Sequence, residues 1–314
     1  MSTSGSPDVR RRRLAAELRR LRLKSDKTAE AVADVLGWSK AKVSRYELAR
    51  GGLKPGEVER LLDVYGVGGD HRRQLLSLAK EATEKGWWES YSDILTEEHL
   101  AFIGLEAEAT SVLQWQINVV PGLLQAKRYA QEIFSGYQDV RALPPAVIER
   151  RVQTRVIRQH RLMGDPRLDL AVIIDESVLR RQRGDHAVMR EQLEHLAKVS
   201  ELPNVTLQVL PLDGPKGLAV DSFQVLAFGK AHETQLHDVV STEGLRNYLF
   251  VEGETDTYEF RRAFEHLAQE ALGTVESREF ILRVARELWA LPAGRGLSGI
   301  PVPMALELNQ EGNR

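Results

Sequence analysis

The chain has 314 residues, of which 42% are hydrophobic and 28% are charged, enough to bury the cores of two or more domains. It has no cysteine, which excludes disulfides and cysteine-ligated metal sites and suits a reducing cytoplasm. It has no apolar run of about 18 residues and no apolar segment after the basic residues near its start. We therefore expect neither a membrane span nor a signal peptide.

The net charge of -2 hides an asymmetry along the chain. Residues 1–85 carry 19 Lys+Arg and 12 Asp+Glu, a charge of +7, whereas the remainder carries 24 and 33, a charge of -9. A basic first part on an acidic remainder indicates that the first part meets a polyanion. Charged runs are more often solvated faces, so the asymmetry alone does not identify the partner.

The first part of the chain shows helical spacing after a short polar segment. Residues 1–8 are small and polar and are predicted to be disordered. Leu14, Leu18 and Leu21 repeat at the spacing of one helix face, which predicts a helix over about residues 9–24. Further apolar repeats predict four more helices, up to about Lys85.

The second of these helices has clear end signals. Thr28 is a good N-cap, and the inward stripe is predicted to be Val32, Val35 and Leu36. Gly37 ends the helix, because glycine readily adopts the left-handed conformation common at helix C-termini. A helix, a turn of about three residues and another helix form the helix-turn-helix pattern.

The third helix, within the stretch GWSKAKVSRYE, has little apolar surface. Ser39 can cap it, and only Val43 and Tyr46 have an inward-facing spacing. The opposite face would protrude, and an α-helix fits the major groove of DNA, where Arg and Lys donate to guanine O6 and N7. The predicted base-contact residues on that face are Lys40, Ala41, Lys42, Ser44 and Arg45. The predicted phosphate contacts are Thr28, Arg50 and Lys54.

The stretch TAEAVADVLGWSKAKVSRYELARG resembles the helix-turn-helix of phage-repressor-like (XRE-type) transcription regulators, and the resemblance covers residues 10–65. In that family an arginine of the first helix pairs with a glutamate at the end of the recognition helix. The matching positions here are Arg22 and Glu47, so the resemblance implies a structural ion pair between them. Tyr46 departs from the family pattern, which usually has an aliphatic residue there.

The remainder of the chain mixes helical and strand patterns. Helices are predicted over about residues 97–116, 125–134 and 145–163. Strands are predicted in five β-branched stretches bounded by turn residues: LDLAVIIDE, VTLQVLP, SFQVLAF, QLHDVVST and LRNYLFVE. Two further helical stripes follow the strands.

These patterns predict an α+β protein in two domains. An N-terminal all-α, five-helix helix-turn-helix domain would span residues 9–85, followed by a larger domain of mixed helices and antiparallel strands over residues 86–290. The Gly- and Pro-rich end, residues 291–314, is predicted to be a flexible tail.

The second domain also carries a resemblance. The stretches GWWESYSDIL, LEAEATSVLQWQINVVPGLLQAKRYA, RVIRQHRL, IIDESVLRR and NVTLQVLPL resemble, in order, a large actinobacterial regulator family of the Scr1 type, which is described as antitoxin-like. With the first domain included, the resemblance covers roughly residues 10–290. Genes of that family commonly lie beside a gene for a small, separate protein thought to be a partner. The resemblance therefore implies that residues 86–290 bind a small partner protein, and it supplies no catalytic residue.

Other candidate sites have simpler interpretations. Asp175 and Glu176 could form a carboxylate site, but a salt-bridged strand end is favoured. His232 and His237 are the closest histidine pair and lack a metal-binding spacing, so no metal or cofactor is expected. The stretch VVPGLLQ lacks the phosphate-loop patterns, and its Pro121-Gly122 pair predicts a sharp turn.

The helix predicted over residues 145–163 is rich in arginine. It could be a second nucleic-acid surface, but a salt-bridged helix face is favoured. Arg158 and Gln159 belong to a motif of the resembled family and could line a ligand or partner site.

The sequence thus predicts a sequence-specific DNA-binding transcription regulator, antitoxin-like, whose second domain binds a small partner protein. The alternative is a helix-turn-helix regulator with a small-molecule sensor domain. An enzyme is disfavoured, because the sequence offers no nucleophile, base and orienting group together, and a scaffold without DNA binding is opposed by the basic first domain. Operator palindromes favour a homodimer. The expected location is the cytoplasm, in association with the nucleoid.

Overall fold

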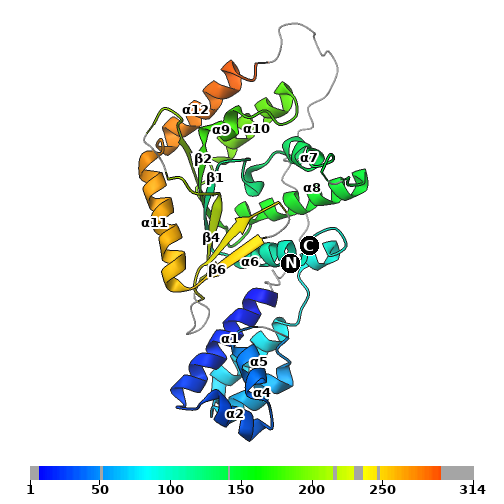
Figure 1. Cartoon of the computed structure of the whole chain (residues 1–314), viewed down its shortest axis with the longest axis vertical. Coiled ribbons are helices and arrows are strands. Elements are labelled where there is room, and N and C mark those ends of the chain that lie inside the picture. Colours follow the sequence, from blue (N-terminus) through cyan, green and yellow to red (C-terminus); the bar gives the residue numbers. More distant parts are fainter. Residues whose placement is uncertain are drawn as a thin grey trace, which may run out of the picture.

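The computed structural model describes residues 7–49, 52–140, 142–214, 218–229, 236–245 and 248–290. An N-terminal group of helices is followed by a domain in which helices flank a six-stranded sheet (Figure 1). The predicted α+β class is therefore confirmed.

The N-terminal domain contains the helices α1 (Pro7–Lys24), α2 (Ala29–Leu36), α3 (Lys40–Glu47), α4 (Pro55–Val64) and α5 (Gly69–Glu81). Their shared core comprises Leu14, Leu18, Leu21, Val32, Leu36, Val43, Tyr46, Val58, Leu61, Leu62 and Leu75, with smaller residues between them. The order and spacing of these helices agree with the prediction, although α1 begins two residues earlier than expected. This core fixes the angle at which α3 leaves α2.

The predicted inward stripe of α2 was partly wrong. Val32 and Leu36 are buried, but Val35 is 70% exposed and Ala33 is buried in its place. Because each residue advances about 100° around a helix axis, Val32, Ala33 and Leu36 share one face, and Val35 lies roughly 110° from its centre. The small Ala33 was overlooked because the larger valine suggested the stripe.

The second domain starts with 3-10 turn η1 (Trp87–Tyr91) and helix α6 (Glu97–Glu108). Its strands are β1 (Ser111–Gln116), β2 (Asp169–Asp175), β3 (Val205–Leu210), β4 (Phe223–Ala227), β5 (Val239–Glu243) and β6 (Tyr248–Glu252). Its other helical segments are η2 (Gly122–Leu124), α7 (Lys127–Ser135), α8 (Pro145–Gln159), η3 (His160–Leu162), α9 (Glu176–Arg180), α10 (His186–Val199), α11 (Glu254–Glu270) and α12 (Thr274–Glu287). All five predicted strands are present.

The sheet is mixed rather than wholly antiparallel. Its strand order is β3-β2-β1-β4-β5-β6. Strands β1, β2 and β3 run parallel to one another. The pairs β1–β4, β4–β5 and β5–β6 are antiparallel. Long helical connections join the parallel strands, as such pairs require. Helix α11 covers one face of the sheet, and α6, α8 and α10 lie on the other side (Figure 1).

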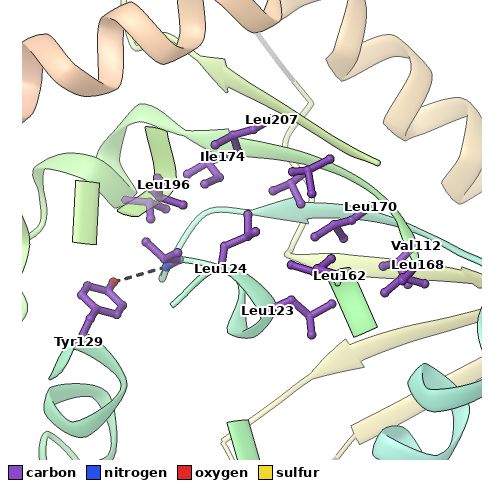
Figure 2. Packing of buried hydrophobic residues seen from close by; sticks show 14 of the residues in the cluster. Val112, Leu123, Leu124, Tyr129, Leu162, Leu168, Leu170, Ile174, Leu196 and Leu207 are labelled. Carbon is purple, nitrogen blue, oxygen red and sulfur yellow. Dashed lines mark hydrogen bonds between the residues drawn. The ribbon is translucent and has the colours of Figure 1, made fainter. Parts of the chain in front are cut away.

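The larger core lies on the side of the sheet opposite α11. Val112, Leu170, Ile174 and Leu207 project from three neighbouring strands into it, and Figure 2 shows them beside Leu123 and Leu124 of η2. On the edge of the same cluster the Tyr129 hydroxyl accepts a hydrogen bond of 3.4 Å from the Val120 amide. Strand β2 packs on both faces and is apolar from Leu170 to Ile174, which is typical of parallel strands.

The prediction of one helix over residues 97–116 was wrong in its second half. Helix α6 ends at Glu108, and residues 111–116 form β1, a central strand of the sheet. No glycine or proline separates the two elements, and apolar residues continue through both. Strand β1 is covered on both faces, so it lacks the simple alternation that reveals a half-exposed strand.

The two domains contact each other through α1. This helix packs against both α5 and α6, and its Val9 belongs to the core of the second domain, together with Trp88. Arg12 pairs with Glu252 at the end of β6, and Arg13 donates to the Gly229 carbonyl at 3.3 Å. Among the described residues, no helix has the length and apolar content to cross a membrane.

Candidate functional site

The turn between α2 and α3 is built by local hydrogen bonds. The Thr28 hydroxyl caps α2 by accepting from the Ala31 amide at 3.1 Å, and Ser39 caps α3 by accepting from the Lys42 amide at 3.2 Å. Gly37 has a φ of 64°, a left-handed conformation that glycine adopts without strain. These short-range signals set a tight helix-turn-helix.

Helix α3 has one face in the core and one face in solvent. Val43 and Tyr46 are buried against the rest of the N-terminal domain. The exposed residues of the other face include Lys40, Ala41, Ser44 and Arg45, and all of these are predicted base contacts. Lys40 lies 3.1 Å from Glu30 in an ion pair whose two side chains are both well exposed, and such pairs contribute little to stability. The structure records no ion pair for Arg45 within the residues that it describes.

Lys42 differs from the other predicted base contacts because its ammonium group is held by its own domain. Its Nζ lies 2.6 Å from an oxygen of Glu57 and 4.2 Å from the centre of the Trp38 ring. The Tyr46 hydroxyl donates to the other oxygen of Glu57, which explains why an aromatic residue occupies this position. To reach a base, Lys42 would have to leave the carboxylate.

The predicted phosphate contacts lie near the two ends of the α2–α3 unit. Thr28 is exposed at the start of α2, and its hydroxyl hydrogen is not used by the capping bond, in which the oxygen accepts. Lys54 is exposed just before Pro55 at the start of α4. Arg50 lies outside the described residues.

Arg22 and Glu47 join the end of α1 to the end of α3. Arg22 donates to both oxygens of Glu47, at 2.7 and 2.9 Å, and also to the Lys27 carbonyl at 2.9 Å. Both side chains are largely buried. The hydrogen bond that Arg22 donates to Glu47 is the main cause that raises the pKa of Arg22. The bidentate geometry fixes the orientation of α3 as well as adding energy.

The arginines of α8 contact other side chains and loops of the second domain. Arg158 donates to both oxygens of Glu106 at 2.7 Å, and their side chains are only 8% and 2% exposed. Arg155 donates to Gln125 at 2.7 Å and lies against Gly122, where a Cβ would come within 3.4 Å of the guanidinium. Gln159 donates to the carbonyls of Gly122 and Gln125. These contacts hold the stretch VVPGLLQ against α8 and favour the interpretation of a bonded helix face over a nucleic-acid surface.

A polar cavity of about 30 Å³ lies between α8, the loop of VVPGLLQ and one face of the sheet. Its lining includes Gln114, Gln116, Gln125, Gln224, Arg155, Arg158, Glu106, Glu243 and Tyr248. The sequence prediction overlooked this site because Gln114 and Gln116 fell in the wrongly predicted helix. Glutamines at alternate positions between buried residues of a strand are the signal that could have revealed it.

The carboxylates at the end of β2 are structural. Asp175 caps α9 by accepting from the Ser177 amide at 2.9 Å. Glu176 is buried, pairs with Arg180 and accepts from the Leu212 amide at 2.9 Å. Both have partners, so neither is free to act as a general base. Within the described part of the chain, no group of acidic and histidine side chains is placed to hold a metal ion.

Acid should destabilise the second domain through His99. Its partly buried ring packs on Phe102 and Tyr248, and burial, together with Arg158, Arg155 and Arg151, lowers its pKa from 6.5 to about 3. The folded protein keeps this ring neutral, whereas the unfolded chain binds a proton below pH 6.5. The contribution of the neutral His99 ring to the free energy of unfolding is therefore complete above pH 6.5, and it is lost as the pH falls towards 3.

We expect the free energy of unfolding of the wild type to fall by about 2 kcal/mol more between pH 7 and pH 5 than that of the His99→Phe variant. Urea unfolding at the two pH values measures this difference. An equal pH dependence in both proteins would contradict a neutral, desolvated imidazole.

Two protein families match the chain. A model for a helix-turn-helix domain matches residues 13–75, which include α2, α3 and the turn between them. This match indicates a DNA-binding regulator rather than an enzyme. A model described as a domain of unknown function, DUF5753, matches residues 100–283, which include the whole sheet and the polar cavity. No curated protein and no solved structure matches the chain. The chain belongs to the family defined by DUF5753, and a helix-turn-helix domain precedes that domain.

Proposed function

We propose that the protein is a sequence-specific transcription regulator that reads operator DNA with α3. The observation that carries this proposal is the exposed face of that helix, which combines Lys40, Arg45, Ser44 and the small Ala41 opposite a fully packed core face. A basic or hydrogen-bonding face next to a small residue suits close approach to base edges in the major groove. Thr28, Lys54 and Arg50 are proposed to contact phosphates, and Lys42 is proposed to contact a base only when it leaves Glu57.

Replacing Arg45 with alanine should weaken binding to the operator by about 1–3 kcal/mol, or roughly 5- to 150-fold, and relax the preference at one base pair. The reason is that Arg45 is exposed on the protruding face, so its loss removes a base contact and leaves the core intact. A fluorescence titration on the DNA upstream of the protein's own gene measures the affinity across a salt series.

Two variants serve as controls for this titration. Lys54→Ala should weaken binding to all DNA sequences equally and lower the salt slope by about 1, because it removes a phosphate contact. Arg190→Ala removes an exposed charge from α10, in the other domain, and should leave DNA binding unchanged. If the wild type and the Arg45→Ala variant bind the operator equally, α3 is not the reading helix.

We further propose that the regulator acts as a homodimer, since two half-sites of a palindromic operator need two copies of α3. Its mass in solution, measured by light scattering with and without operator DNA, tests this part. A single copy on a full operator would contradict it.

For the second domain we propose an antitoxin-like role in which residues 86–290 bind a small partner protein. The support is the sequence resemblance to the Scr1-type family and the position of this domain against α1, which allows a bound partner to influence the DNA-binding domain. The small protein encoded beside the gene, added to the purified regulator in calorimetry, is the test. If mixing the two proteins gives no heat of binding and does not change the affinity for DNA, the small protein is not a partner of this domain.

A second candidate function for this domain is small-molecule sensing in the cytoplasm. One observation favours it: the cavity beside α8 has a lining of unusually polar, buried side chains. Ligand sites combine an enclosed space with a few convergent polar groups.

A further inference from the structure

Two buried glutamines lie side by side at the centre of the sheet. Gln114 of β1 is paired in register with Gln224 of β4, and both line the polar cavity beside α8. In the part of the chain that the structure describes, no hydrogen bond is recorded for either side-chain amide, although buried polar groups are usually bonded. The neighbouring register pair on this face, Val112 and Leu226, is apolar, so packing does not require an amide here.

Arg155 of α8 lines the same cavity with a positive charge that has no close carboxylate. One of its terminal nitrogens donates to the neutral amide of Gln125 at 2.7 Å, and its Nε is buried without a hydrogen-bond partner. No ion pair is recorded for Arg155 within the described residues. A buried charge without a counter-charge costs free energy.

The two carboxylates near the cavity do not supply this counter-charge. Glu106 accepts two hydrogen bonds from Arg158 at 2.7 Å, so its charge is already matched. Glu243 is exposed at the end of β5, where water weakens its attraction, and it is hydrogen bonded to Tyr248. Burial is the main cause that lowers the pKa of Arg155, Arg158 lowers it further, and the carboxylates do not offset this. Because arginine is not deprotonated in proteins, the site holds positive charge without a close counter-charge.

The Arg155 guanidinium is held in place by its surroundings. Its central carbon lies 4.9 Å from the centre of the Phe134 ring, and a Cβ on Gly122 would come within 3.4 Å of it. Together with the hydrogen bond to Gln125, these contacts keep the charged group at the cavity rather than in solvent. A charge fixed in this way is preorganised for a ligand of opposite sign.

The size of the cavity restricts the ligand to a very small anion. Its volume of about 30 Å³ has room for roughly two water molecules. Acetate, phosphate and sulfate are too large for this space. A chloride ion is only slightly larger than a water molecule, so it meets both the size and the charge of the site.

We propose that the cavity beside α8 is a binding site for a single halide ion, with chloride as the natural ligand. The Nε–H group of Arg155 supplies the opposite charge, and the side-chain amides of Gln114 and Gln224 supply N–H donors. The bound ion links α8 to β1 and β4 and thereby stabilises the second domain. This site does not depend on the proposed reading of DNA by α3.

The first test measures the melting temperature of the full-length protein in sodium chloride, sodium bromide or sodium gluconate at constant ionic strength. Chloride or bromide at about ten times its dissociation constant should raise Tm by about 3–6 °C relative to gluconate, whose anion is too large for the cavity. Salts also act on the whole protein surface, so the difference in Tm between chloride and gluconate is compared between variants.

Variants assign this difference to the site. Arg155→Met removes the charge and keeps a long side chain, so it should abolish the rise in chloride and should not lower Tm in gluconate. Gln224→Leu keeps the charge but removes one donor, and it should weaken halide binding at least about tenfold. The matched control is Arg150→Met on the same helix, because Arg150 pairs with the exposed Asp93. This control should keep the full rise in chloride.

Crystals grown in sodium bromide locate the ion, because bromine scatters anomalously. We expect a peak between the Nε of Arg155 and the amides of Gln114 and Gln224. The proposal is wrong if bromide lies only elsewhere, if the wild type and Arg155→Met gain equally from chloride, or if Arg155→Met lowers Tm equally in chloride and gluconate. The last result would give Arg155 a structural role alone. None of these results affects the operator titration of the Arg45→Ala variant, so the two proposals fail separately.

Discussion

Replacing Glu106 with glutamine is expected to lower the free energy of unfolding by about 3–5 kcal/mol. The variant keeps the shape of the side chain but leaves the Arg158 guanidinium buried without a counter-charge. Burial alone would lower the pKa of Arg158, and the charge and hydrogen bonds of Glu106 outweigh this and raise it. An arginine is not deprotonated in proteins, so Arg158 stays charged in the variant, and the cost of its desolvation is no longer offset by Glu106.

Urea unfolding followed by far-UV circular dichroism measures this loss. Glu201→Gln is the matched control, because Glu201 forms an exposed ion pair with Arg278, and its replacement should cost less than about 1 kcal/mol. The double replacement Glu106→Met and Arg158→Met should recover much of the lost stability, since it removes both buried charges. If both single variants lose the same free energy of unfolding, the buried pair Arg158–Glu106 contributes no more to stability than the exposed pair Arg278–Glu201.

The second large effect is expected at the ion pair between α1 and α3. Replacing Arg22 with leucine removes the two hydrogen bonds to Glu47 and leaves that carboxylate buried and uncompensated, at a cost of about 3–5 kcal/mol to the N-terminal domain. Because Glu47 is the last residue of α3, the orientation of α3 should loosen as well. Operator binding should fall with the stability of the domain.

Amide hydrogen exchange distinguishes this effect from the loss of a base contact. In the Arg22→Leu variant, exchange should become faster in α2, α3 and α4 and remain slow in β1 and β2. In the Glu106→Gln variant, exchange should become faster in β1 and β2 and remain slow in α2, α3 and α4. In the Arg45→Ala variant, exchange should be unchanged in both domains. Unchanged exchange in α3 of the Arg22→Leu variant would mean that the ion pair does not hold the helix.

The N-terminal domain was predictable to a large extent because its signals are local. Thr28, Gly37 and Ser39 mark helix ends through contacts within a few residues, and the leucine spacing of α1 needs only the geometry of one helix. The exposed face of α3 followed from the same periodicity. Val35 was the exception, because whether Ala33 or Val35 faces the core depends on where the neighbouring helices lie.

In the second domain, contacts between distant segments decided what local patterns did not reveal. Strand β1 is a strand because β2 and β4, which are far away in the sequence, flank it, and its own residues continue the apolar run of α6. The parallel pairing of β1, β2 and β3 likewise depends on the helical connections and not on strand composition.

The sequence by itself determined the α+β class, the helix-turn-helix and the exposed basic helix, since each arises from periodicity and capping within a short segment. Tertiary structure alone decided that Lys42 bonds Glu57, that Arg158 bonds Glu106 and that Gln114 meets Gln224. Partners separated by 15, 52 and more residues cannot be read from spacing. The buried polar cavity exists only where those long-range contacts converge.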